Sequence, residues 1–279
     1  MWESFLHGKS EKGKSLKKEC IDIGVNLTSP SFQKDRKEVI DNALAQGIKV
    51  MIITGTSIRA SHDALAVAQT MPGVLYCTAG VHPHDSRHCD ERTLQNLENL
   101  SKNKEVVAIG ECGLDYNRNF SPQDVQDYWF ESQVDLACKL KKPLFLHERD
   151  AHNSLMSILK KYQEKLPPTV VHCFTGNESE LKDYLDRDFY IGITGWVCDE
   201  RRGIPLRNLL KYIPSNRLMI ETDAPFLLPR NMPKRPASGR NEPAYLIYVL
   251  KMIADCLKKS EEEIARITTE NAKEFFKIN

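Results

Sequence analysis

Four residues of types that bind metal ions stand directly after short apolar runs of this 279-residue sequence. They are Glu111, His147, His172 and Asp223. A single histidine beside an apolar run is usually a core residue, but buried carboxylates are rare unless a partner neutralises them. One bound divalent cation would explain all four, and mixed imidazole and carboxylate ligands suit Mg²⁺ or Mn²⁺, with Zn²⁺ as the alternative. We therefore predict a metal site built from these side chains, holding one or two ions.

Two further histidines, His82 and His84, lie in a proline-braced turn after the apolar run 75–80. Either could bind the metal or donate a proton to a substrate oxygen. We favour His82 as the active-site residue because it lies nearer to the end of the run, and we assign His84 to substrate binding.

Short apolar runs alternate with longer amphipathic segments, which is typical of parallel strands connected by helices. The predicted strands are 20–25, 49–54, 75–80, 106–110, 143–147, 169–173, 189–193 and 217–222. The predicted helices are 35–46, 61–70, 91–102, 122–140 and 153–165. We expect Ser121 to be the N-cap of one helix and Pro122 its first residue.

Eight strand and helix units in about 260 residues fit a (β/α)8 TIM barrel, and an open doubly wound sheet is the alternative. The polar residues favour the barrel, because active sites of barrels form where the loops after the strands meet. Six polar residues stand at the predicted strand ends: Asn26, His82, Glu111, His147, His172 and Asp223. A barrel would bring them to one rim although they are far apart in the sequence.

Composition excludes several classes of protein. A hydrophobic fraction of 41% is too high for a disordered chain, and no apolar run approaches the roughly 18 residues of a membrane span. The 8 cysteines are scattered without paired spacing, which indicates reduced thiols inside a cell. With 39 basic against 38 acidic residues, any attraction to nucleic acid must be local to a site.

Residues 1–19 are rich in lysine and lack the apolar stretch of a secretory signal, so we expect a flexible basic tail before a single domain over 20–279. The segment 8–15 matches the G-x-x-x-x-G-K-S pattern of phosphate-binding loops. That loop requires a strand before it and a helix after it. The tail has room for neither, so we do not assign nucleotide binding to it.

Cationic and aromatic residues gather in the loops after several predicted strands. They are Tyr116, Arg118, Phe120, Trp196, Arg201, Arg202, Arg230, Lys234, Arg235 and Arg240. Such a set suits a single nucleic-acid strand, whose bases stack on aromatic rings while its phosphates pair with cations. From this set we select Trp196, Arg201 and Arg240 as substrate-binding residues.

Motifs along nearly the whole chain resemble the TatD family of metal-dependent deoxyribonucleases. The matching segments are 22–28, 80–84, 107–115, 146–150, 171–176, 190–203, 221–225 and 240–243. The resemblance implies a (β/α)8 barrel of the metal-dependent hydrolase type. It also implies a 3′–5′ exonuclease that uses Mg²⁺ to cut single-stranded DNA, with RNA as a further substrate.

The family's metal ligands fall on Glu111, His147, His172 and Asp223, with His82 and Glu221 as further active-site positions. This assigns catalysis to Asp223, Glu221, His82 and Glu111, and it adds Asn26 and Arg149 to the substrate-binding residues. Many family members have His-x-His in the first strand, where this chain has Gly24 and Asn26. We predict that one of two metal positions is weakened or shifted toward Mg²⁺.

Metal-assisted hydrolysis is the leading hypothesis, with Asp223 as general base because an aspartate at a strand end can reach both the metal and its water. Glu221 lies two residues earlier, on the same side of the strand, where it could hold a second ion. One alternative is an ester or amide hydrolase such as an aminoacyl-tRNA deacylase. Another is a non-catalytic nucleic-acid-binding protein that depends on metal.

We expect a monomer in the cytoplasm, with the nucleus as the alternative compartment. We expect no membrane association and no secretion. DNA repair and the degradation of DNA during apoptosis are both compatible with the family.

Overall fold

The computed structural model describes residues 18–279. The segment 8–15 and most of the predicted tail therefore lie outside the described residues. Within the described chain, Lys18 forms an ion pair with Glu261 at 2.7 Å, and Thr269 donates a hydrogen bond to the carbonyl of Glu19 at 2.9 Å. These contacts tie the start of the described chain to the last helix.

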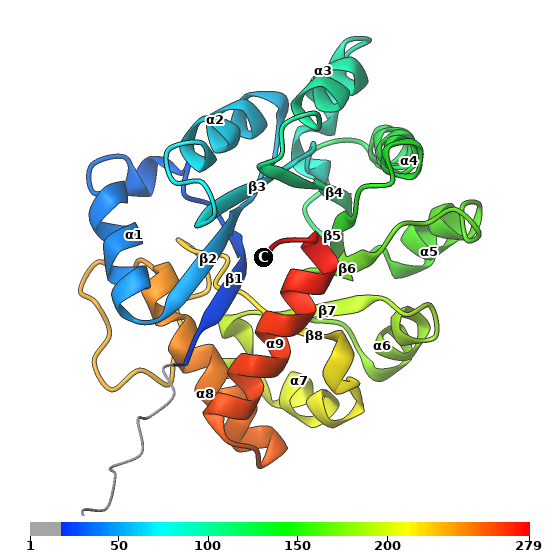
Figure 1. Ribbon diagram of the computed structural model, residues 1–279. Coiled ribbons are helices and arrows are strands. Elements are labelled where there is room, and N and C mark those ends of the chain that lie inside the picture. The colour runs from blue at the N-terminus through cyan, green and yellow to red at the C-terminus, as the bar shows by residue number, and fades with distance from the viewer. Residues whose placement is uncertain (1–17) are drawn as a thin grey trace, which may run out of the picture.

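Eight parallel strands follow one another in sequence order around a barrel, as predicted, and helices surround it (Figure 1). The strands are β1 (Cys20–Val25), β2 (Ile48–Ile53), β3 (Leu75–Ala79), β4 (Val106–Asp115), β5 (Leu144–Arg149), β6 (Thr169–Val171), β7 (Tyr190–Ile193) and β8 (Leu218–Ile220). The helices are α1 (Arg36–Ala45), α2 (Ile58–Ala68), α3 (Thr93–Leu100), α4 (Gln123–Leu140), α5 (His152–Lys160), α6 (Glu178–Leu185), α7 (Ile204–Leu209), α8 (Leu246–Leu257) and α9 (Glu261–Phe276).

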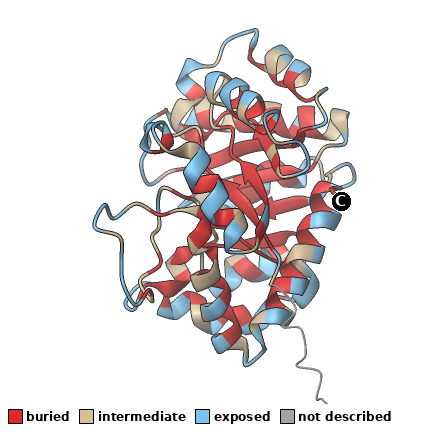
Figure 2. Cartoon of the chain, turned by 60° about the vertical axis from the view of Figure 1, so that its left-hand side comes forward, coloured by how far each residue is buried: buried red, intermediate tan, exposed pale blue. Residues whose placement is uncertain are grey.

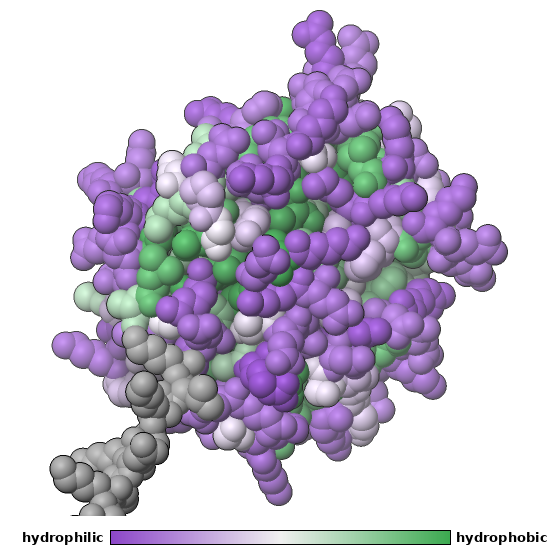
Figure 3. All heavy atoms as spheres, viewed as in Figure 1, coloured by the Kyte–Doolittle hydropathy of each residue, from purple (hydrophilic) through white to green (hydrophobic). Residues whose placement is uncertain are grey.

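Two apolar cores hold the barrel together, because its strands are buried on both faces (Figure 2). The outer core lies between the strands and the surrounding helices. The inner core fills the barrel, and Phe275 and Phe276 of α9 pack into it. This helix crosses in front of the barrel opening in Figure 1, and hydrophilic side chains cover its outer face in Figure 3. Helix α9 thereby closes the end of the barrel at which the strands begin. A site can therefore form at the other rim, where the strands end.

The barrel closes between β1 and β8 through a few contacts beyond the end of β8. The N–H of Asn26 donates to the carbonyl of Ala224 at 2.7 Å, and the N–H of Asp223 donates to that of Gly24 at 2.8 Å. Asp22 reinforces this seam from within, since its carboxylate accepts hydrogen bonds from the N–H and the hydroxyl of Thr222 at 2.9 and 2.5 Å. Thr222 stands between Glu221 and Asp223, so the seam fixes both carboxylates.

The largest difference from the predicted elements is in β4. The strand was expected to end at residue 110, which would place Glu111 after it, but it continues to Asp115. The pairing with β5 shifts register between Gly110 and Cys112, where Gly110 adopts φ 142°, a conformation that L side chains rarely take. A side chain at Gly110 would also collide with the backbone of Phe145.

The predicted helix bounds differ from the observed ones by up to five residues, and two of the differences have a visible cause or extent. Helix α4 begins at Gln123 with Pro122 as its N-cap, because the Ser121 hydroxyl instead accepts from the N–H of Arg87 at 3.1 Å and donates to the carbonyl of His84 at 2.9 Å. Helix α5 ends at Lys160, short of the predicted residue 165, and irregular turns follow it.

All eight cysteines are free thiols. Among residues 18–279 we find no helix that combines the length and the apolar character of a membrane span.

Candidate active site

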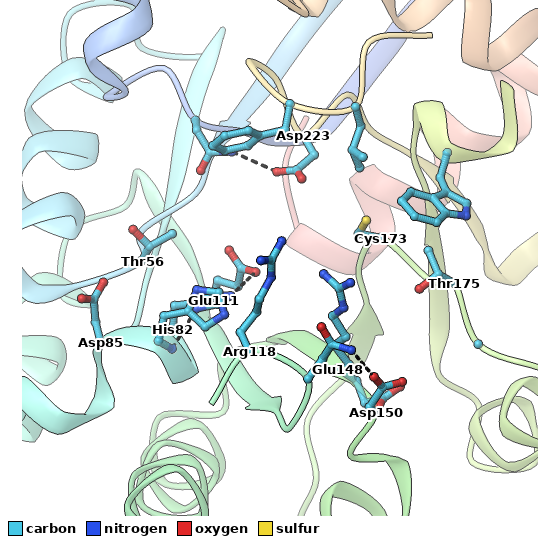
Figure 4. A pocket seen from close by; sticks show the side chains of 18 of the residues that line it. Thr56, His82, Asp85, Glu111, Arg118, Glu148, Asp150, Cys173, Thr175 and Asp223 are labelled. Atoms are coloured by element: carbon cyan, nitrogen blue, oxygen red, sulfur yellow. Dashed lines mark hydrogen bonds and ion pairs between the residues drawn. The ribbon is translucent and has the colours of Figure 1, made fainter. Parts of the chain in front are cut away.

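One carboxylate oxygen, Oε1 of Glu111, lies at the centre of a cluster of histidines. The nearest nitrogens of His172, His147 and His82 lie 2.7, 3.0 and 3.4 Å from it. The three histidines come from β5, from the end of β6 and from the turn after β3, and Figure 4 shows Glu111 beside His82 in the cavity. The barrel thus brings together the predicted metal ligands Glu111, His147 and His172 with the predicted catalytic His82.

The alternation of side chains along the strands explains why these residues meet. Successive side chains of a strand point to opposite faces, so residues two apart share a face. Phe145 and Val170 point into the inner core, and His147 and His172 follow them by two residues. The site is therefore the last layer of the barrel interior, where ionisable side chains replace apolar ones.

The cluster carries an internal ion pair. Burial raises the pKa of Glu111, but the charges and hydrogen bonds of His172, His82 and His147 together outweigh this effect and hold that pKa well below its usual range. Burial lowers the pKa of His172, but the charges of Glu111 and Glu221 outweigh it and hold that pKa well above its usual range. Burial lowers the pKa of His82 to about 3. These shifts favour a Glu111 carboxylate paired with a His172 imidazolium, beside a neutral His82, in the protein without metal.

Glu221 is fully buried behind the cluster. Its Oε2 lies 3.3 Å from Nδ1 of His172, and its Oε1 accepts a hydrogen bond from the N–H of Cys173 at 2.5 Å. A carboxylate that accepts a hydrogen bond from one ring N–H fixes the orientation of the imidazole and leaves the other nitrogen for a ligand. Glu221 thus lies within reach of the predicted metal ligands and orients one of them.

Asp223 lines the cavity above the histidine cluster (Figure 4). Asn26 donates a hydrogen bond from Nδ2 to its Oδ1 at 2.9 Å, so the two sequence-predicted residues from opposite ends of the chain do meet. Burial raises the pKa of Asp223 to about 7. A carboxylate with such a pKa can exchange a proton near neutral pH.

Asp115 is a member of the site that the sequence analysis did not select. Its Oδ2 lies 2.6 Å from Nε2 of His84 and 3.6 Å from Nε2 of His147. Burial raises the pKa of Asp115, but the neighbouring imidazoles of His147 and His84 outweigh it, so that pKa lies below its usual range. A signal was present in the sequence, because Asp115 follows Glu111 by four positions and therefore shares its face once the strand continues.

A divalent metal ion fits these residues. Nε2 of His147 is buried without a hydrogen-bond partner among the described residues, although buried polar atoms almost always have one. Ligand atoms of His82, Glu111 and His147 all lie within 4.8 Å of one another. Imidazole nitrogens and carboxylate oxygens are donors that divalent metals accept. The donor set and the unpartnered nitrogen together support a metal centre here.

The cluster lies at the floor of a cavity of about 1250 Å³. The cavity lining includes seven of the predicted site residues: Asn26, His82, His84, Glu111, Arg149, Trp196 and Asp223. It also includes Arg118 and Phe226, which were not among the selected substrate-binding residues. Figure 4 shows the Arg118 side chain extending into the cavity, between Asp223 and the pair Glu148 and Asp150.

Two arginines selected from the sequence do not line this cavity. Arg240 forms ion pairs with Asp35 at 2.6 Å and Glu242 at 2.7 Å, and its guanidinium lies 5.0 Å from the ring centre of Phe32. Its contacts fasten the late loop to the start of α1, so we assign it a structural role. Arg201 is exposed outside the lining, while its neighbour Arg202 stacks on the Trp196 ring at 4.5 Å.

Comparisons with known proteins agree with this geometry. The family described as TatD related DNase matches residues 21–277. The 3′-5′ ssDNA/RNA exonuclease TatD of Enterobacter lignolyticus (strain SCF1) is 50% identical over 92% of this chain and 99% of the relative. The protein of the same name from Salmonella typhimurium is 48% identical over the same shares.

Solved structures of similar proteins share the fold. A TatD family hydrolase from Entamoeba histolytica has a TM-score of 0.83 and 27% identity over 94% of this chain and 99% of the other. A TatD homologue from Escherichia coli has a TM-score of 0.84 and 26% identity over the same shares.

Proposed function

Since this chain belongs to the TatD-related DNase family, we propose that it is a metal-dependent exonuclease that shortens single-stranded DNA, and also RNA, from the 3′ end. The observation that carries the proposal is the convergence of three histidines on Oε1 of Glu111 at the floor of an open cavity. Two arginines in the lining, Arg118 and Arg149, supply charge for phosphates.

We propose that Glu111, His147, His172 and Asp223 hold the metal, with His82 beside them. Mg²⁺ is the proposed ion, because two of these ligands are carboxylates and Gly24 and Asn26 supply no further imidazole. When bound, the ion would polarise a phosphate oxygen and acidify a water. Mn²⁺ can replace Mg²⁺ in an activity assay. Comparing the activity in Zn²⁺ with that in Mg²⁺ would test whether the site prefers metals that bind oxygen ligands.

The chain's own residues then have separate tasks. Asp223 takes the proton from the attacking water, and the hydrogen bond from Asn26 holds its carboxylate in place. Glu221 orients His172 through Nδ1. Arg149 and Arg118 hold phosphates of the strand, while His84 and Trp196 contact the substrate at the cavity wall.

A 5′-labelled single-stranded oligonucleotide tests the proposal. In Mg²⁺ we expect a ladder of progressively shorter labelled products, which is the signature of cleavage from the 3′ end, and in EDTA we expect intact substrate. Immediate release of a labelled mononucleotide would contradict the polarity. If the oligonucleotide stays intact in Mg²⁺ and Mn²⁺ while a charged tRNA loses its amino acid, the deacylase hypothesis replaces the nuclease. Binding without any turnover would favour a non-catalytic protein.

A further inference from the structure

Phe226 is an exposed aromatic side chain on the wall of the cavity, three residues after Asp223. It is 59% exposed. The other large apolar side chains exposed among residues 18–279 are Phe120, Tyr128, Ile204 and Tyr212, and Phe226 alone of the five lines the cavity. An exposed phenylalanine side chain contributes little to the stability of the core. Because this one lies beside the proposed general base, we expect a ligand to cover it.

The backbone under this ring is firmly held. The N–H of Phe226 donates to the carbonyl of Asp223 at 3.0 Å, and the carbonyl of Phe226 accepts from Nδ2 of Asn241 at 2.7 Å. Asn241 is fully buried and also donates to the carbonyl of Thr222 at 3.0 Å. A rigid backbone that carries an exposed aromatic ring is a preorganised contact surface, since little conformational freedom is lost when a ligand binds.

The charges in the cavity indicate the class of ligand. Arg118 and Arg149 line the same cavity and can pair with phosphates, and the histidine cluster lies at its floor. The backbone hydrogen bond between Phe226 and Asp223 closes a turn, so both residues lie on the wall of the cavity in which a phosphodiester would be cut. A flat apolar group attached to that phosphate through a sugar is a nucleobase, and bases stack on aromatic side chains without regard to sequence.

We propose that Phe226 stacks on a nucleobase at the 3′ end of the strand and so places the terminal phosphodiester against Asp223 and the histidine cluster. This inference rests on the proposed exonuclease function and names the part of the substrate that the cavity recognises. The contact favours an unpaired base, because turning the terminal nucleotide into the cavity then breaks no base pair. Phe226 thereby accounts for a preference for single strands.

Kinetics on two oligonucleotides test the contact. One has an ordinary 3′-terminal nucleotide, and the other has an abasic nucleotide there. We expect Phe226→Ala and Phe226→Leu to raise KM for the ordinary substrate roughly tenfold, in line with the loss of one base stack. We expect Phe226→Tyr, which keeps the aromatic face, to stay within about twofold of wild type. On the abasic substrate the wild type and Phe226→Ala should have equal KM values.

Tyr128→Ala is the matched control, because Tyr128 is also an exposed aromatic residue but lies outside the cavity lining. An unchanged KM for Phe226→Ala, or an equal loss on both substrates, would contradict the base contact while leaving the exonuclease intact. Failure of the wild type to cut either substrate would overturn the proposed function instead. In that case, anisotropy of a fluorescent oligonucleotide still decides whether Phe226→Ala weakens binding.

Discussion

Glu221 occupies the space that a side chain at Gly24 would need. A Cβ atom at Gly24 would overlap Oε2 of Glu221, and one at Gly192 would lie 2.7 Å from Oε1 of the same carboxylate. The buried carboxylate therefore sits between glycines of β1 and β7, beside the histidine cluster. In this chain a histidine at position 24 and Glu221 in its present position exclude one another.

The first prediction concerns that exclusion. Gly24→Ala should lower the free energy of unfolding by about 1–3 kcal/mol, as for other overpacked interiors, and should weaken metal binding because Glu221 must move. Combining Gly24→Ala with Glu221→Ala removes the clash, so the two effects should be strongly non-additive. Denaturant unfolding of the two single variants and the double variant measures this coupling, and strictly additive losses would show that the overlap is harmless.

The second prediction is that metal binding releases protons. Burial raises the pKa of Asp223 to about 7, and the charges of Glu111 and Glu221 hold the pKa of His172 above its usual range despite burial. Both groups therefore carry protons in the metal-free protein at mildly acidic pH and must lose them to become ligands. Metal affinity should rise with pH from about 6 to 8.

Titration calorimetry in two buffers of different ionisation enthalpy counts the released protons. The heats should differ between the buffers at pH 6.5 and converge at higher pH. An affinity that does not change with pH would contradict the protonation states that we assign.

The third prediction concerns the seam between β1 and β8. Thr222→Val removes a hydroxyl that donates to the fully buried Asp22, and a buried acceptor left without a donor costs about 1–3 kcal/mol. Because Thr222 stands between Glu221 and Asp223, kcat should fall more than KM rises. Thr222→Ser, which keeps the hydroxyl, is the control and should recover most of both. A loss of stability with unchanged kcat would show that the seam has a purely structural role.

The fourth prediction separates two arginines that the sequence analysis treated alike. Arg149 lines the cavity, and Arg149→Ala should raise KM for an oligonucleotide roughly tenfold and flatten its salt dependence. Arg240 is held by Asp35 and Glu242, so Arg240→Ala should lower the melting temperature by a few degrees and leave KM near wild type. A large increase in KM for Arg240→Ala would show that Arg240 binds the substrate, and would contradict its structural role.

The sequence was sufficient for the barrel and for most of the residues that gather around Glu111. Strands buried on both faces appear as short continuous apolar runs, and the ionisable residues that interrupt these runs, such as His147 and His172, mark the rim. The extension of β4 to Asp115 could not be anticipated, because the register shift at Gly110 depends on pairing with β5. The loops were least predictable, since charge alone does not distinguish Arg149 in the cavity from Arg240 in an ion-pair network.

Glu111→Gln, assayed beside Glu164→Gln, tests the central claim most directly. Glu111 is the residue on which the histidines converge, whereas Glu164 is exposed outside the active-site cavity. A bound metal contributes several kcal/mol to the transition state, so we predict that Glu111→Gln loses exonuclease activity about a thousandfold or more. Its metal binding should be lost as well, while its fold is retained and Glu164→Gln behaves as wild type. Near-normal shortening of a single-stranded oligonucleotide by folded Glu111→Gln would contradict the account.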